Sequence, residues 1–579
     1  MDSELEEFLA RRFRIPRSTS DKVRSLETAI SENVRPGDAI HLGQTHVRSS
    51  VGFFELLRRF HGTDPGFTLL GVQVSTPVSP LVHAGLARKV VTSWAGDSYW
   101  APGPSPVYQR AWSGGVEFEH WSILSYVQRL QAAARGMAWT TTRSLGGSTM
   151  AEDNAPEAYR ELEPGLGLVS ALAPDISIFH AAAADPAGNV LMTPPLMENA
   201  YGALAARRGA IVTVERVVDP SFVRAHAHLA RIPDDAVCAV VEAPLGGHPG
   251  GMYAETIPGF ESYGEDYEFW VDMRDAARDP AAMGAWIKEW VLECPTHASY
   301  LGRLGEERIE KLRRRANPEG WREELERALP ALDLEERHSG IELAVVVGAR
   351  TIADRIRSEG YSVVLAGAGM ANLAAWAATF ALADEDVSVD LAAEMGLVGY
   401  WPRPGEPILF NQRNFPTCTM LVDIDWTLSV LVGGHASRSI GALGAAQVDR
   451  RGNINSTVIP GERLLMGSGG ANDVATCAGE TVVIALQSRD RFVDSVPYVT
   501  APGERIRRVV SQLGVFVKEE DELVLSAVTG QDVDAAVREA RERCGWDLRV
   551  ARNVERIQPP SRTELLTIRL MDPHGWFRR

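Results

Sequence analysis

The sequence predicts an α/β protein built from two tandem, homologous domains, each an open and mainly parallel sheet with helices on its faces. Three observations support this prediction. Motifs of the first half return in the second half, short β-rich runs alternate with helical segments, and a charge-dense stretch at 306–339 separates the halves. At 579 residues, the chain is also too long for a single hydrophobic core.

The duplication is visible in short motifs. Asp185-Pro-Ala-Gly-Asn189 returns as Asp449-Arg-Arg-Gly-Asn453, each after a mostly apolar segment. Ala39-Ile-His-Leu-Gly43 opens the first half much as Ser362-Val-Val-Leu-Ala-Gly367 opens the second. The spacing from Gly43 to Gly188 in the first half is longer than the spacing from Gly367 to Gly452 in the second, so the first half carries an insertion. Such a period is too long for a solenoid and fits two copies of one domain.

The individual elements follow from local composition. Tyr361–Ala366 is a buried strand by its β-branched run, and Ala371–Leu382 has helical composition and length. Strand, glycine turn, helix and next strand form a βαβ unit with parallel strands. The stretch 306–339 predicts two exposed helices ending in a linker at 334–340, between domains 1–333 and 341–579. We also expect a helix at 123–135, and a helix and a strand at 531–550.

Charge and cysteine usage restrict the class of protein. The net charge of −17 disfavours nucleic acid and anionic membranes as main partners. The first residues are acidic, unlike a secretory leader, and no apolar run is long enough to span a bilayer. Five scattered cysteines without a C-x-x-C pair predict reduced thiols and no zinc site. We therefore expect a globular cytoplasmic protein with no bound metal.

The most informative stretch runs from Val387 to Tyr400. It places Glu394 between an apolar, strand-like run and Gly396, at the carboxyl end of a strand, where open α/β sheets bind their ligands. Further along, Gly467-Ser-Gly-Gly-Ala-Asn-Asp473 puts three glycines before a helical segment. Gly467, Gly469 and Gly470 let the backbone N–H groups approach an anion. The pattern predicts a carboxylate nucleophile beside an oxyanion cradle; a solvated glutamate and a sharp turn are the plainer interpretation.

Gly367-Ala-Gly369 marks a second glycine turn, between a strand and a helix. It resembles a dinucleotide-binding fingerprint, but the third position is Asn372 instead of glycine or alanine. A tight turn whose amides face a ligand, or simply pack, accounts for it equally well.

The first half offers two further candidate sites. Glu117 and Glu119 alternate along a strand and so share one face, which suits an acid/base pair or merely charges before a helix. His46 and Arg48, shortly after Gly43, are placed to hold an anionic substrate or to form a solvated pair on a loop.

Together these features resemble the class I coenzyme A transferases, nearest to the glutaconate CoA-transferase type, with an α-like and a β-like half fused in one chain. The resemblance covers most of the sequence and depends on motifs in a shared order: Glu117-Phe-Glu-His-Trp-Ser122, Thr142-Arg-Ser-Leu-Gly-Gly147, Asp185–Asn189, Ala243–Gly251, Gly367-Ala-Gly369, Ala393-Glu-Met-Gly396, Val448–Asn453 and Gly467–Asp473.

The resemblance implies that Glu394 is the nucleophile of a ping-pong exchange of CoA between an acyl-CoA and a small carboxylic acid, through a glutamyl-CoA thioester. The glycines at 43, 367, 369, 396, 467, 469 and 470 would bind the oxyanion or CoA. No tightly bound cofactor is implied, because CoA arrives as the substrate thioester. The family also implies a homodimer, with the active site between the halves.

Two departures from the family pattern leave alternatives open. Gly43-Gln-Thr-His46 stands where the family has Gly-Gly-Phe-Gly, and the nucleophile context is Ala-Glu-Met-Gly. A hydrolase or ring-opening, C–C bond-cleaving enzyme on the same fold would use Glu117 or Glu119 for acid/base work. A non-catalytic regulator that binds a metabolite is the third interpretation.

Overall fold

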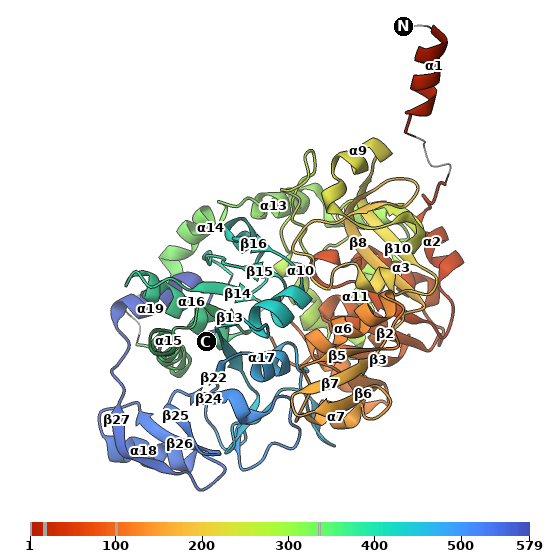
Figure 1. The fold of residues 1–579 in the computed structure, drawn as a ribbon. Helices are drawn as coiled ribbons and strands as arrows, with labels where there is room; N and C mark the ends of the chain where they lie inside the picture. The colour runs from red at the N-terminus through yellow and green to blue at the C-terminus, as the bar shows by residue number, and fades with distance from the viewer. Residues whose placement is uncertain are drawn as a thin grey trace.

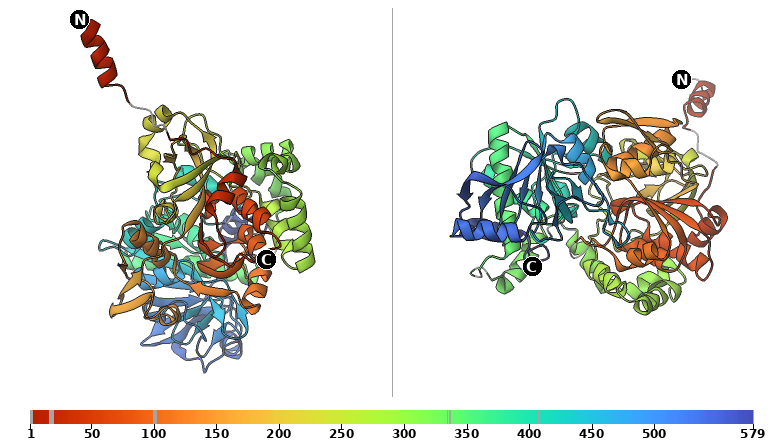
Figure 2. Two further views of the ribbon diagram at one scale, coloured as in Figure 1. Left: turned by 90° about the vertical axis from the view of Figure 1, so that its right-hand side faces the viewer. Right: turned by 90° about the horizontal axis from the view of Figure 1, so that it is seen from below.

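The computed structural model describes residues 3–15, 20–98, 102–333, 335, 337–406 and 408–578. The two halves of the chain lie side by side, the first coloured red to yellow-green and the second green to blue in Figure 1 and, from below, in Figure 2. Helix α1 (Ser3–Arg12) stands away from the body. Part of the predicted linker, at 334 and 336, lies outside the described residues, so the domain boundaries stay a proposal.

The N-terminal sheet confirms the expected parallel architecture. Its parallel strands follow the order β12-β10-β8-β1-β2-β3-β4, and short antiparallel strands β9 and β11 extend it beside β8. Every residue of β8 is buried, as expected for a strand covered on both faces. The bounds are β1 (Ala39–Leu42), β2 (Phe67–Val74), β3 (Ala87–Ala95), β4 (Glu117–His120), β8 (Ile176–Ala184), β9 (Val190–Leu191), β10 (Ala210–Val217), β11 (Ala230–Ile232) and β12 (Val237–Glu242).

The C-terminal sheet has ten strands in the order β16-β15-β14-β13-β17-β22-β24-β25-β26-β27. Strands β14, β13, β17, β22 and β24 are parallel to one another, while β15, β16, β25 and β26 are joined by antiparallel pairing. The bounds are β13 (Val363–Ala366), β14 (Asp390–Ala393), β15 (Leu397–Val398), β16 (Met420–Leu421), β17 (Ser439–Gly444), β22 (Glu480–Ile484), β24 (Ile506–Val510), β25 (Gly514–Glu519), β26 (Glu522–Val528) and β27 (Val550–Arg556).

The two halves share strand order and turn chemistry. β10-β8-β1-β2 matches β22-β17-β13-β14 strand for strand, all parallel. In each half the repeated Asp–Asn motif closes the same turn. The Asp185 carboxylate accepts from the backbone and side-chain nitrogens of Asn189, each at 3.0 Å. Asp449 does the same with Asn453, at 2.9 and 3.0 Å. The sequence repeats therefore correspond to a repeated structure.

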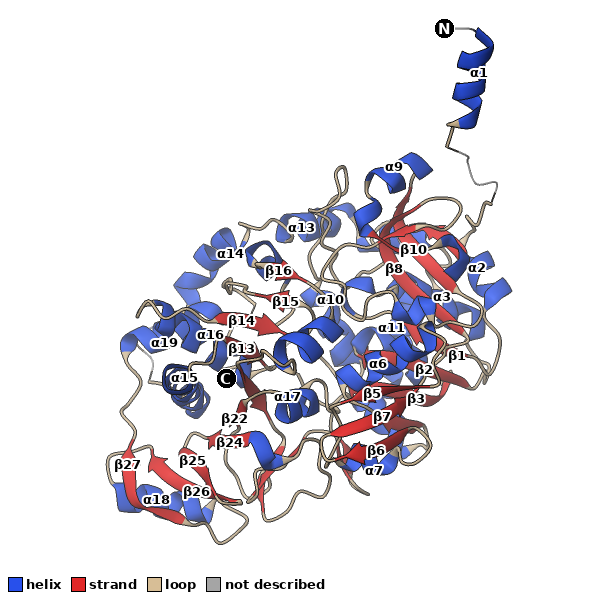
Figure 3. Cartoon of the chain, in the orientation of Figure 1, coloured by secondary structure: helices blue, strands red, loops and turns tan. Residues whose placement is uncertain are grey.

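The helices pack on the sheets, as Figure 3 shows. The predicted helices at 123–135 and 371–382 are α6 (Ile123–Ala134) and α16 (Met370–Ala383), and the charged stretch forms α13 (Glu306–Arg315) and α14 (Trp321–Ala328), which bury few side chains. In the tail, α18 (Val533–Glu542) lies within the expected range, whereas β27 begins only at its last residue. Other helices are α2 (Leu26–Asn33), α3 (Ser50–Phe60), α4 (Ser79–His83), α5 (Pro106–Ser113), α7 (Thr149–Asp153), α8 (Tyr201–Leu204), α9 (Pro220–Ala225), α10 (Tyr267–Ala276), α11 (Pro280–Ile287), α12 (His297–Leu304), α15 (Gly340–Glu359), α17 (Ala471–Cys477) and α19 (Arg562–Met571).

The insertion of the first half supplies part of the contact between the halves. It contains β4, α6 and a small antiparallel sheet of β5 (Trp139–Thr142), β6 (Tyr159–Glu163) and β7 (Leu166–Ser170). One hydrophobic cluster includes α6 residues such as Leu124 and Val127 together with the core of the C-terminal sheet. The halves are therefore held by a shared apolar core. Among the described helices, none combines the length and apolar character required to cross a bilayer.

Candidate active site

Glu394 lies directly after the carboxyl end of β14, in the turn that joins it to β15. The turn folds back tightly, with Ala393 paired to Leu397. Gly396 has φ +108°, and a Cβ there would lie 2.3 Å from the carbonyl oxygen of Val422. A side chain at 396 would therefore push the turn away from its neighbour. The glycine two residues after Glu394 thus holds the carboxylate in place.

The Glu394 carboxylate faces Gly470, at the start of α17. The Gly470 N–H donates a hydrogen bond to it, and a Cβ at 470 would lie 1.9 Å from Oε2 of Glu394. No other amino acid has room at 470 without displacing the carboxylate. The structure thereby brings together two residues that the sequence pattern pairs, Glu394 and a glycine of the 467–473 motif.

The segment Gly467–Gly470, here called the glycine loop, is bound to the first half. The Gly469 N–H donates to Ser93 O at 2.9 Å, and the Ile123 N–H donates to Gly469 O at 3.1 Å. Gly467 pairs with Trp94 in an isolated bridge, and a Cβ at 467 would lie 2.4 Å from Ser93 O. The loop thus joins the end of β3 and the start of α6, and α17 lies where the halves meet (Figure 1).

The amides of most candidate glycines already have protein partners. The N–H groups of Gly43, Gly367, Gly396, Gly467 and Gly469 donate to the carbonyls of Ile178, Ala442, Ala393, Ser456 and Ser93. These glycines permit close chain packing instead of presenting a row of open donors. Gly369 differs: it begins α16 with φ +71°, and no atom lies within 4 Å of the position a Cβ would take. Oxyanion binding by these glycines therefore stays a prediction. Gly369 fits it because the space beside it is open, and Gly470 because its N–H points at Glu394.

Asp473 is a site residue that the sequence pattern did not single out. It is fully buried in α17, where it accepts from Ser144 Oγ at 2.6 Å and from the Leu124 N–H at 3.1 Å. Its neighbour Asn472 accepts from the Leu145 N–H at 2.8 Å. The Asn-Asp pair thus fastens the glycine-loop helix to the first half. The available signal was the Gly467–Asp473 motif itself, of which Asp473 is the last residue.

Burial controls the charge of both carboxylates. Burial, and next the Asp473 carboxylate, raise the pKa of Glu394 to about 8, although the Gly470 N–H opposes this shift. Burial also raises the pKa of Asp473 to about 6, against the hydrogen bonds from Ser122 and Ser144. A carboxylate kept from water and beside a like charge is destabilised as an anion, so it gains more on attacking an electrophile.

The raised pKa predicts how activity depends on pH. Attack requires the ionised form of Glu394, so kcat/KM should rise as pH passes through the pKa near 8. In Asp473→Asn the neighbouring negative charge is gone, the pKa of Glu394 falls, and the rising limb should move to lower pH. The measurement is the pH profile of kcat/KM for both proteins. Coincident profiles would contradict this role of Asp473.

Glu117 and Glu119 share one face of β4, as predicted, and both contact Lys89, at 2.8 and 2.7 Å. Glu119 also accepts from Arg129 at 3.1 Å and from Trp121 Nε1 at 2.7 Å. Burial would raise the pKa of Glu119, but Arg129, Lys89 and Trp121 outweigh it and the pKa is lowered. An ionised, paired carboxylate cannot act as a general acid at neutral pH. This geometry therefore does not favour a hydrolase or C–C bond-cleaving enzyme in which Glu119 acts as the general acid.

His46 and Arg48 lie just after β1, in the first half. Burial, with a smaller contribution from Arg48, lowers the pKa of His46 to about 4, so the imidazole is neutral at pH 7. Arg48 is only 3% exposed; it donates to Ser75 Oγ at 3.2 Å and stacks over Trp270. Arg48 is thus buried and His46 half-buried, which differs from the solvated pair of the plainer interpretation, and anion binding by them stays a prediction.

The site is thus a half-buried carboxylate beside a glycine N–H, at the junction of two sheets of like strand order. The family model described as "Coenzyme A transferase" matches residues 23–243 and 425–538, more than half of the chain. The chain belongs to the coenzyme A transferase family. Its two halves correspond, in chain order, to the two separate subunits of the glutaconate and 3-oxoadipate types, fused here in one chain.

Individual relatives support this assignment. The first of the two 3-oxoadipate CoA-transferase subunits from Pseudomonas knackmussii is 28% identical over 49% of this chain and 98% of its own length. The corresponding glutaconate CoA-transferase subunit from Acidaminococcus fermentans is 27% identical over 50% of this chain and 94% of its own. The second subunit of the Pseudomonas enzyme is 32% identical, over 24% of this chain and 61% of its own length.

A solved structure shows the fold over nearly the whole chain. The acyl-CoA transferase from Escherichia coli O157:H7, in a thioester complex with CoA, superposes with a TM-score of 0.64. The match covers 96% of this chain and 98% of that one, at 15% sequence identity. The two tandem sheets are therefore those of the CoA-transferase fold.

Proposed function

We propose that the protein exchanges CoA between an acyl-CoA and a small carboxylic acid by a ping-pong mechanism, with Glu394 as nucleophile. One observation carries the proposal: the half-buried Glu394 carboxylate accepts a hydrogen bond from the Gly470 N–H, at the junction of the halves. Relatives of both halves carry CoA-transferase names. Membership of the family supports a CoA thioester as substrate, and the choice of acyl groups stays open.

The first half-reaction forms two covalent intermediates. The Glu394 carboxylate attacks the thioester carbonyl, the C–S bond breaks, and CoA leaves as a thiolate from an acyl-glutamyl anhydride. The thiolate then attacks the glutamyl carbonyl of that anhydride, which gives a glutamyl-CoA thioester and releases the first carboxylate. No net oxidation and no water is involved, so the free energy of the thioester is conserved.

The second half-reaction reverses these steps with the acceptor acid. Its carboxylate attacks the glutamyl thioester and expels CoA thiolate, and the thiolate attacks the acyl carbonyl of the new anhydride. Glu394 returns as a carboxylate. Where the oxyanion forms on the glutamyl carbonyl, the Gly470 N–H that already bonds Glu394 would stabilise it, and one such donor is worth roughly 2.7–4 kcal/mol in comparable sites.

Burial supports transfer over hydrolysis. The Glu394 side chain is half-buried beside the glycine loop, and partial burial limits the access of water to its carboxylate. An anhydride or thioester formed there is shielded while the acceptor binds. The cytoplasmic location and the homodimer inferred from the sequence stay predictions.

The covalent intermediate is the direct test. The protein is incubated with a panel of acyl-CoAs, then with borohydride or hydroxylamine, and analysed by intact and peptide mass spectrometry. We expect a CoA-sized adduct, or the reduced or hydroxamate product, on the peptide containing Glu394. Free CoA accumulating without an adduct would contradict the proposal and favour a hydrolase.

A further inference from the structure

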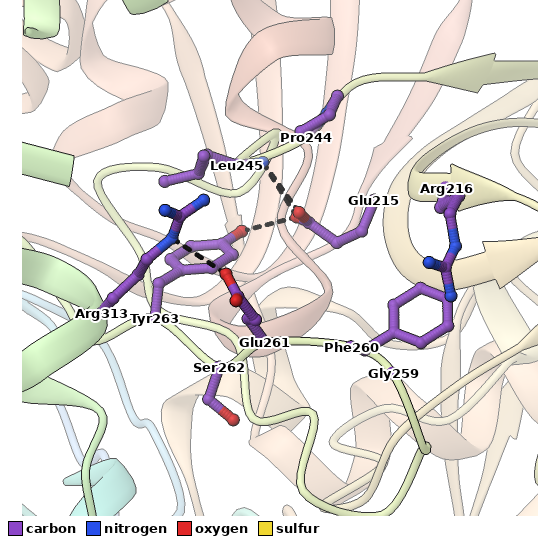
Figure 4. A pocket seen from close by; sticks show the side chains of 10 residues that line it. All are labelled: Glu215, Arg216, Pro244, Leu245, Gly259, Phe260, Glu261, Ser262, Tyr263 and Arg313. Carbon is purple, nitrogen blue, oxygen red and sulfur yellow. Dashed lines mark hydrogen bonds and ion pairs between the residues drawn. The ribbon is translucent and has the colours of Figure 1, made fainter. Parts of the chain in front are cut away.

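A cavity of about 240 Å³ lies in the first half, near the carboxyl ends of β10 and β12 (Figure 4). This volume equals that of about eight water molecules in the liquid. Its lining includes Glu215, Arg216, Leu245, Phe260 and Tyr263. The proposed CoA exchange uses none of these residues. The cavity nevertheless lies at the sheet edge where open α/β folds bind ligands.

Glu215 presents a carboxylate to this cavity. Its Oε1 accepts from Tyr263 OH at 3.1 Å and from the Leu245 N–H at 3.0 Å, and His180 Nε2 lies 2.7 Å away. Figure 4 shows the carboxylate between Leu245 and Tyr263. The side chain is 14% exposed, and its one ion-pair partner among the described residues is His180, which carries a charge only when protonated. A largely buried carboxylate that no lysine or arginine pairs with favours a ligand that carries a positive charge.

Arg216 supplies the opposite charge. Its guanidinium stacks on the Phe260 ring, 4.2 Å from the ring centroid, and among the described carboxylates none forms an ion pair with it. The other arginine of the lining, Arg313, is already matched by Glu261 at 3.1 Å. The cavity thus presents a carboxylate that no described lysine or arginine pairs with and a guanidinium that no described carboxylate pairs with, beside the apolar side chains of Leu245 and Phe260.

We propose that this cavity is a second ligand site, for a small zwitterion with an apolar side chain, such as an aliphatic α-amino acid. The ligand's ammonium group binds Glu215, its carboxylate binds Arg216, and its side chain packs on Leu245 and Phe260. This site goes beyond the proposed CoA exchange and does not depend on it.

The loop 245–251 connects the cavity with the segment after β1. At one end, Leu245 donates to Glu215 and adopts φ +55°, a strained conformation for leucine, while the Gly247 N–H donates to Tyr263 OH at 3.3 Å. At the other end, Gly251 O lies 3.4 Å from His46 Nδ1. A ligand that fixes Glu215 and Tyr263 therefore also orders the loop that contacts His46. Ligand binding in the cavity is therefore coupled to the ordering of the segment around His46.

Calorimetry tests the site, with L-leucine titrated into the full chain in the absence of any acyl-CoA. We expect one molecule bound per chain. 4-Methylpentanoate lacks the ammonium group and 3-methylbutylamine lacks the carboxylate, so each should bind at least about tenfold more weakly, a change of about 1.4 kcal/mol. No binding of L-leucine, or equal binding of the two half-ligands, would overturn the proposal.

Matched variants identify the cavity as the place of binding. Glu215→Gln keeps an acceptor for the Leu245 N–H but loses the charge, and Arg216→Ala removes an exposed side chain. Each should weaken binding at least about tenfold, whereas Arg224→Ala, an exposed arginine of α9, should leave it unchanged. If Glu215→Gln fails to fold, Arg216→Ala decides alone. L-leucine binding that survives Arg216→Ala would overturn the assignment.

Hydrogen exchange tests the coupling without any measurement of activity. L-leucine should slow exchange of the amides of loop 245–251 and of the segment around His46. Protection confined to other parts of the chain would overturn the coupling.

Discussion

Glu394→Gln should abolish CoA exchange, lowering kcat by at least about 10⁴-fold, because replacing a catalytic nucleophile removes the covalent route itself. Glutamine has nearly the shape of glutamate but cannot form the anhydride or the glutamyl thioester. The variant should also lose the CoA adduct in mass spectrometry. Steady-state rates with the best acyl-CoA donor of the panel provide the measurement.

The control for this substitution is Glu32→Gln, at an exposed position of α2. It makes the same chemical change away from the site and should keep full activity. An unchanged melting temperature in both variants would show that each is folded. Turnover by Glu394→Gln at the rate of the unmodified protein would contradict Glu394 as the nucleophile.

Gly470→Ala should reduce kcat by about 10²-fold or more, since misplacing a reacting group by about 1 Å costs this much. The Cβ of alanine would lie 1.9 Å from Oε2 of Glu394, so either the carboxylate or the glycine loop must move. The loss should appear mainly in kcat, because the substitution displaces the nucleophile more than the bound substrate. Initial rates over a range of acyl-CoA concentrations separate kcat from KM.

Gly302→Ala is the matched control for the glycine substitution. Gly302 lies in α12 with no atom within 4 Å of the position of a Cβ, so alanine fits there. Activity should be unchanged and stability slightly higher, since alanine favours helix over glycine by about 1 kcal/mol. Equal activity of Gly470→Ala and Gly302→Ala would show that the close contact with Glu394 is not needed.

Local patterns were sufficient for much of the fold. The β-branched run before Gly367 and the alanine-rich segment after it predicted a strand and a helix whose bounds differ from the observed ones by only a few residues. The Asp–Gly–Asn repeats indicated a duplication, and the structure shows a turn with the same hydrogen bonds in both halves. Such features depend on residues close together in sequence, so the sequence alone carries them. The helix α19 was missed, although Ser561 and Glu564 form a capping box at its start.

The features of the candidate site also fall into those that the sequence predicted and those that only the structure showed. The sequence by itself determined that Glu394 ends a strand, that a glycine follows it, and that a glycine-rich segment precedes a helix. Only the tertiary structure decided that Gly470 contacts Glu394, that Asp473 adds a second buried charge, and that Glu119 is neutralised by Lys89 and Arg129. Burial and pairing between distant segments determine charge and contact, and no local sequence pattern records which distant segments will meet.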